Sequence, residues 1–174
     1  MPISPGHSQF INLNIGVAFC EVGLRELEVF ENANPKSFDQ DSVAKTCVSL
    51  FDISQGLELI FRSILLASGV SIKFKGNHPI KDMYTEISER YPNLSDNMTK
   101  IGISDNSVAE LLTTLQRGHA NARYFGLGNG RKKLNFAGLK YVRQFYLLVG
   151  FTFLTGIPMF RRINAQYFDG SDHS

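Results

Sequence analysis

Apolar residues recur every three or four positions along five segments of this 174-residue chain, and that spacing restricts its fold more than any other feature. Residues three or four apart lie on one face of an α-helix, so each segment is expected to form a helix with an apolar side. The predicted helices cover residues 9–32, 39–68, 79–89, 105–125 and 135–153, and Pro, Gly or polar residues separate them. We therefore predict an all-α protein, an up-and-down antiparallel bundle of about five helices.

The length of the chain fits one domain. We expect residues 1–168 to form a single helical-bundle domain and residues 169–174 to be a disordered tail. Residues 94–106 are polar, and we expect them to be irregular apart from one helical turn. Residues 71–74 are the only plausible short strand, since no alternating pattern of a β-hairpin is convincing elsewhere.

The two cysteines, Cys20 and Cys47, lie in apolar stretches with helical spacing. They indicate buried thiols in a reducing compartment, and neither has the CxxC or HxxxH companion that a structural zinc site needs. The N-terminal residues 1–16 lack the basic region and apolar run of a secretory signal. We expect a cytoplasmic protein with no metal centre and no cofactor.

Charge is distributed unevenly along the chain. Residues 111–168 contain no Asp or Glu but nine Lys and Arg, whereas residues 1–110 carry nine Lys and Arg against fourteen Asp and Glu. A basic surface raises the local concentration of ligands that bear phosphate, which favours a nucleotide or nucleic acid as partner. Three alternatives stay open: the basic third packs against the acidic two-thirds, it meets an acidic protein, or it lies on an anionic membrane surface.

Two groups of side chains in the basic third are candidates for holding phosphate. His119 and Arg123 are four residues apart and would share a helix face, where an Arg can offer its bidentate fork. The loop of Gly126, Gly128 and Gly130 would let backbone N–H groups approach an anion beside a basic triplet. The predicted ligand-binding residues are Arg117, His119, Arg123, Tyr124, Arg131, Lys132 and Lys133.

A structural reading competes with each of these candidates. His119 extends the apolar side of its helix and fits a hydrogen-bonded core histidine, and Arg123 fits a residue that neutralises the helix C-terminus. The glycine-rich loop follows a helix and does not match the GxxxxGK[ST] pattern, so it also fits a solvated loop. Tyr124 could stack on a base. No Ser-His-Asp or Cys-His arrangement can be placed, and we predict no catalytic residue.

Residues Phe145 to Phe160 form an apolar run of sixteen residues without a charge. A membrane-spanning helix needs about twenty such residues, and this run contains two glycines and a proline. We therefore expect no stable membrane insertion. The run fits either a helix buried within the chain or one whose burial is completed in a homodimer.

Three segments, in order along the chain, resemble the HEPN superfamily of helical bundles: Ser54–Leu66, Asn77-His78-Pro79 with the residues up to Tyr84, and Ala122-Arg123-Tyr124 with the two residues after it. The first is similar to the pattern of the second HEPN helix, the next to the start of the third, and the last to the end of the fourth. The resemblance implies a bundle associated with nucleotide binding.

One departure from this superfamily bears on catalysis. HEPN ribonucleases carry an Arg that is followed after four to six residues by a His, whereas here a single residue separates Arg117 from His119. The resemblance therefore implies the non-catalytic branch, whose members bind a nucleotide or RNA or accompany a nucleotidyltransferase, often as dimers. A divergent ribonuclease and a protein-interaction module without a ligand remain the alternatives.

Overall fold

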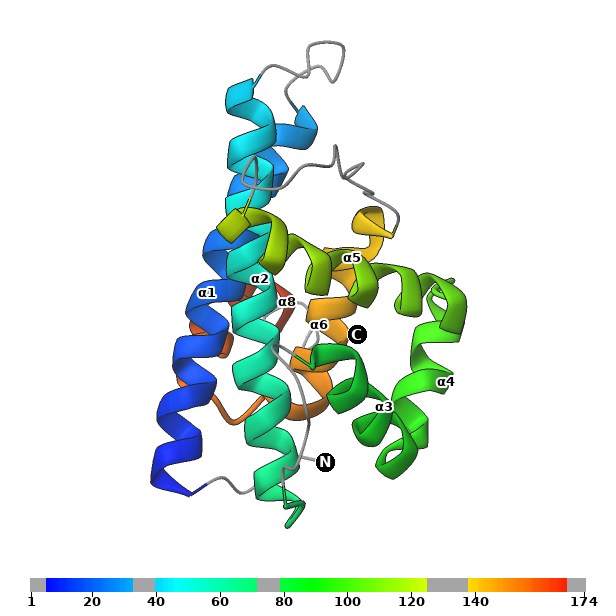
Figure 1. The fold of residues 1–174 in the computed structure, drawn as a ribbon. Coiled ribbons are helices and arrows are strands. Elements are labelled where there is room, and N and C mark those ends of the chain that lie inside the picture. The colour runs from blue at the N-terminus through cyan, green and yellow to red at the C-terminus, as the bar shows by residue number, and fades with distance from the viewer. Residues whose placement is uncertain (1–5, 33–39, 72–78, 125–137, 169–174) are drawn as a thin grey trace.

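The computed structural model describes residues 6–32, 40–71, 79–124 and 138–168, and these residues form helices with no strand among them (Figure 1). The all-α prediction is therefore confirmed. In chain order the elements are α1 (His7–Asn32), α2 (Gln40–Ala67), α3 (Ile80–Arg90), α4 (Pro92–Lys100), α5 (Asp105–Tyr124), the 3-10 turn η1 (Leu139–Tyr141), α6 (Val142–Phe153), α7 (Pro158–Ile163) and α8 (Ala165–Phe168).

The two longest helices, α1 and α2, run antiparallel side by side (Figure 1). They approach each other closely because glycines at their contact have no side chains to separate them. A Cβ atom added at Gly56 of α2 would lie 2.6 Å from the carbonyl oxygen of Gly16 on α1. One added at Gly23 of α1 would lie 2.7 Å from the carbonyl oxygen of Ser49 on α2. The two backbones are therefore in direct contact, closer than the usual 8–10 Å spacing of helix axes allows with larger residues.

Helix α2 lies at the centre of the fold and also contacts α3 and α5. Most of its apolar side chains are buried, and Leu57, Phe61 and Ile64 are fully so. Phe61 meets Tyr84 of α3 and Phe145 of α6 at ring-centroid distances of 5.9 and 6.4 Å. Tilted and edge-to-face aromatic pairs of this kind add to the stabilisation that burial provides.

The apolar run from Phe145 to Phe160 is buried mainly within the chain. Helix α6 ends at Phe153, and α7 folds back so that the ring of Phe160 covers Gly150, where even a Cβ atom would clash with it. Of the two alternatives for this run, the structure shows burial within the chain. None of the helices in the described ranges combines the length and the apolarity that crossing a bilayer requires.

Helix α6 begins later than residue 135, where the sequence pattern placed the start of the last helix. Gly138 has a φ of 80°, a left-handed conformation that interrupts a right-handed helix, and η1 follows before α6 starts at Val142. A Cβ atom at Gly138 would also lie 2.8 Å from the backbone nitrogen of Leu111 on α5. This glycine therefore sets both the helix start and the docking of η1 on α5. Residues 135–137 lie outside the described part.

Residues 94–106 were expected to be irregular, and this expectation is wrong for their first half. Pro92 occupies the first turn of α4, where a missing N–H is tolerated, and Leu94 and Met98 share its buried side. Two apolar residues in nine give a weak periodic signal, although they suffice here because α3, α5 and α6 cover them.

Two further expectations need correction. The apolar spacing of the first helix predicts an inward side chain at Phe10, but this residue is 36% exposed. The up-and-down arrangement is seen for α1 and α2, whereas α5 crosses α2 steeply and α3 and α4 lie to one side (Figure 1). The described ranges hold eight α-helices where about five were expected, because α4 is additional and two short helices, α7 and α8, follow the predicted last helix. Residues 72–78 and 169–174 lie outside the described residues. The first range includes the expected strand, apart from Ser71, and the His78 segment, and the second is the expected tail.

Candidate functional site

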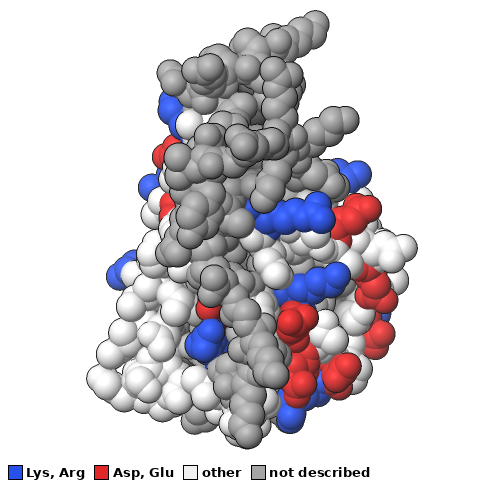
Figure 2. Space-filling model, in the orientation of Figure 1, with Lys and Arg blue, Asp and Glu red and all other residues white. Residues whose placement is uncertain are grey.

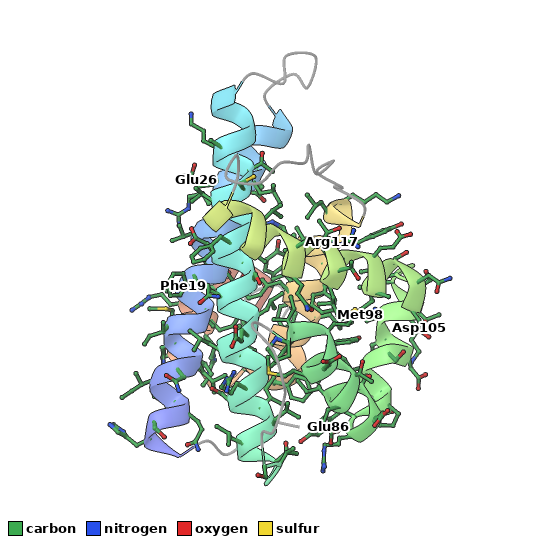
Figure 3. All side chains as sticks on the ribbon, in the orientation of Figure 1. Phe19, Glu26, Glu86, Met98, Asp105 and Arg117 are labelled. Atoms are coloured by element: carbon green, nitrogen blue, oxygen red, sulfur yellow. The ribbon has the colours of Figure 1, made fainter. Side chains whose placement is uncertain are left out.

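The predicted phosphate-binding residues on α5 lie in its C-terminal half. Arg117 is exposed there (Figure 3). His119, Arg123 and Tyr124 belong to the last turns of the same helix, and their side chains are outside the described part of the structure. The helical backbone between residues 119 and 123 is what the predicted shared face requires. Residues 131–133, the basic triplet, are also outside the described ranges.

A cavity of about 310 Å³ between α1, η1, α6 and α8 brings together two further cations of the carboxylate-free segment, Lys140 and Arg143. Its floor is apolar and its rim polar. The lining residues are Leu24, Leu27, Glu28, Leu139, Lys140, Val142, Arg143, Gln144, Leu147 and Tyr167. The sequence carries no local pattern for this group, because only folding brings α1 and α8 to the same place as α6.

Arg143 is held by a carboxylate from the acidic part of the chain. Its Nε atom lies 2.6 Å from Oε1 of Glu28 on α1, and both side chains are partly exposed, by 33% and 51%. For this residue, packing of the basic third against the acidic two-thirds is therefore the arrangement found. An ion pair this exposed stabilises the fold by no more than about 1 kcal/mol, so a competing anion can displace it.

The other described cations of the segment keep their charges available. Arg161 and Arg162 are exposed on α7. The guanidinium of Arg161 lies 5.6 Å from the ring centroid of Phe168, and Nζ of Lys140 lies 4.8 Å from that of Tyr141. Stacking on a ring leaves a cation able to bind an anion.

The described cations do not form one patch on the face that Figure 2 shows. On the side of the view where α3 to α5 lie, blue and red side chains alternate. The lower left, over the N-terminal half of α1, is uncharged. Among the described residues, the positive charge that could meet a polyanion therefore comes from several elements, with carboxylates nearby.

Buried polar side chains fix α7 against α1. Nδ2 of Asn164, the residue that ends α7, donates to Oε1 of Glu21 at 3.3 Å and to the carbonyl oxygen of Phe160 at 3.1 Å. Burial raises the pKa of Tyr146, and the neighbouring Cys20 and Glu21 raise it further, although no acceptor has hydrogen-bond geometry to its hydroxyl. The phenol therefore stays neutral at physiological pH, which fits a structural role.

The two cysteines are free and buried, as the sequence predicted. Burial raises the pKa of both thiols, and for Cys20 the charge of Glu21 adds to the effect. A thiol is a poor nucleophile when its pKa is raised, since the thiolate is the reactive form. Neither cysteine is therefore placed for nucleophilic catalysis.

A second, smaller cavity of about 180 Å³ lies between α3, α4 and α5 and is rich in hydroxyl groups. Oγ of Ser95 donates to Oδ1 of Asp105 at 2.8 Å. Burial raises the pKa of Tyr84 to about 12, and the negative charge of Asp105 contributes. Lys81 and Asp105 balance each other in this cavity, whereas the cavity beside Lys140 has two cations against Glu28 and is therefore better suited to an anion. Within the described parts of the chain, no three His, Cys, Asp or Glu residues are grouped so that they could hold a metal ion.

The chain matches no protein-family model, no curated protein and no solved structure. The resemblance to HEPN bundles therefore stays a prediction from the sequence.

Proposed function

We propose that this protein is a non-catalytic, HEPN-like helical bundle that binds a nucleotide or RNA through its basic C-terminal third. The observation that carries the proposal is the segment 111–168, which has nine cations and no carboxylate. Four of its described cations, Arg117, Lys140, Arg161 and Arg162, are exposed. Phosphate groups are attracted to such a segment without any need for a specific sequence of bases.

The cavity beside Lys140 supports the same proposal with a different kind of contact. Tyr167, at its rim, is 46% exposed and offers a ring on which a base can stack. Arg143 offers a planar fork that fits a phosphate, and its present partner Glu28 is partly exposed and exchangeable. A nucleotide would thus place its phosphates over the cations and its base against the ring of Tyr167.

Replacing Glu28 with glutamine is expected to tighten binding of RNA about fivefold, because it releases Arg143 for a phosphate. Binding can be measured by fluorescence anisotropy with a labelled single-stranded RNA of about twelve nucleotides and, in parallel, with labelled ATP. The matched control is Glu86→Gln, which removes one negative charge from an ion pair on α3, where Arg90 Nε lies 2.8 Å from Glu86 Oε1.

Equal affinities for the two variants would show that Arg143 takes no part. Absence of binding by the unaltered protein to both probes would contradict the proposed function as a whole. Electrophoresis of the RNA after each titration adds a third readout: shortened RNA would replace a non-catalytic protein with the divergent ribonuclease.

A further inference from the structure

The outer side of α1, which faces away from the core, is apolar. Four large side chains on it are exposed although their helix is well packed on its inner side: Ile11 by 46%, Ile15 by 43%, Phe19 by 37% and Val22 by 50%. The uncharged area at the lower left of Figure 2 lies over the N-terminal half of α1, and Figure 3 labels Phe19 on the left edge of the same helix. An apolar surface of several neighbouring side chains indicates an interaction site.

The spacing of these residues is that of a coiled-coil seam. Ile11, Ile15, Ala18 and Val22 are separated by four, three and four positions, as successive d and a positions of a heptad are, so they form one stripe that can face a partner helix. We call these four residues the outer seam. The inner side of α1, which includes Leu13, already packs in the core, so the outer seam is additional to what the fold needs.

We propose that the outer seam of α1 pairs antiparallel with the outer seam of a second copy of this chain. A two-fold symmetric interface has to be self-complementary. The spacing of four, three and four reads the same in both directions, so an antiparallel pair sets Ile11 against Val22 of the other copy and Ile15 against its Ala18. A second copy of the chain therefore matches the outer seam without any other partner.

Charges at the ends of the helix favour the same arrangement. Glu26 is exposed beyond one end of the outer seam, and His7 is exposed at the first residue of α1 beyond the other. In the antiparallel pair Glu26 approaches the N-terminus of the other α1, where free N–H groups carry partial positive charge, and its His7.

A lipid surface suits this face less well. Helices that lie in a membrane interface are rich in Lys and Arg along the polar side, whereas residues 8–24 contain neither. The outer seam spans eleven residue steps, about 16 Å of helix. A pair of seams this short buries less surface than a standard interface, which takes about 800 Å² from each partner. We therefore expect a dimer with micromolar affinity.

The first test is the molecular mass in solution, by sedimentation equilibrium between roughly 1 and 200 µM. We expect the mass to rise with concentration from 19.5 kDa toward twice that value. The double variant Ile15→Glu, Val22→Glu should remain at 19.5 kDa throughout. The control Val48→Glu, Leu66→Glu, with side chains 56% and 41% exposed on α2, should associate as the unaltered protein does.

The second test fixes the direction of the pair and leaves most of the seam unaltered. A mixture of the Ile11→Cys and Val22→Cys proteins should form a disulfide-linked dimer under mild oxidation. Ile11→Cys alone should not, because its two copies would be about 16 Å apart, beyond the 7 Å limit between Cα atoms of a disulfide.

Three results would overturn the proposal. The first is a monomer at every concentration, including one that instead sediments with phosphatidylcholine vesicles. The second is association that the α2 control weakens as much as the seam variant does. The third is cross-linking of Ile11→Cys with itself, which would mean a parallel pair.

Discussion

Replacing Gly56 with alanine is expected to destabilise the protein by about 3 kcal/mol, the upper end of the typical range for overpacking a protein interior. In an exposed helix the same change stabilises by about 1 kcal/mol, because alanine is the better helix former. Here the new Cβ atom would lie 2.6 Å from the carbonyl oxygen of Gly16 and 2.8 Å from the backbone nitrogen of Cys20. Backbone atoms cannot rotate away, so α1 would have to move from α2 along its length.

Urea denaturation followed by circular dichroism at 222 nm measures this change as a shift of the midpoint at constant slope. The matched control is Gly156→Ala in the turn between α6 and α7, where an added Cβ atom meets nothing within 4 Å. The control should stay within about 0.5 kcal/mol of the unaltered protein. A Gly56→Ala protein as stable as the control would contradict the close packing of the two helices.

Changing Arg123, Arg131, Lys132 and Lys133 together to alanine is expected to weaken RNA binding about tenfold or more at moderate salt. The four cations belong to the carboxylate-free segment and are the largest local group in it. The slope of log K against log salt is negative, and each lost phosphate contact should reduce its magnitude by about 0.7 for a single strand. Anisotropy titrations at four salt concentrations give both quantities.

The control removes the same charge elsewhere. Lys45, Lys81, Arg90 and Lys100 are exposed on α2, α3 and α4, and their joint replacement by alanine also lowers the net charge by four. If binding depends on the basic third, this control should lose less than threefold. Equal losses in the two variants would mean that RNA responds only to the total charge of the protein.

Helix positions were largely predictable because apolar residues recur with helical spacing along each long helix. Gly69, with a φ of 76°, follows α2 where the sequence placed a helix-ending glycine. Helix α1 shows the limit of this reasoning. It is apolar on two sides, and the periodicity alone does not say which side meets α2. Phe10 and Ile15 both have helical spacing to other apolar residues, and both are exposed.

The candidate site was predictable only as a property of the sequence. The absence of carboxylates from residues 111–168 can be read directly, whereas the contact between Arg143 and Glu28 joins residues that are 115 positions apart. The cavity that Arg143 shares with Tyr167 depends on α7 folding back over Gly150. Contacts of this kind follow from the packing of the whole chain and have no local pattern.

Photocrosslinking with RNA that contains 4-thiouridine tests the central claim most directly, because it reports which peptides touch the bound strand. We expect crosslinked peptides, identified by mass spectrometry, to come from residues 111–168, and those around Arg117 and Lys140 to be among them. Crosslinks confined to residues 1–110, or their absence at concentrations where the titration is saturated, would contradict the claim that the basic third receives the phosphates.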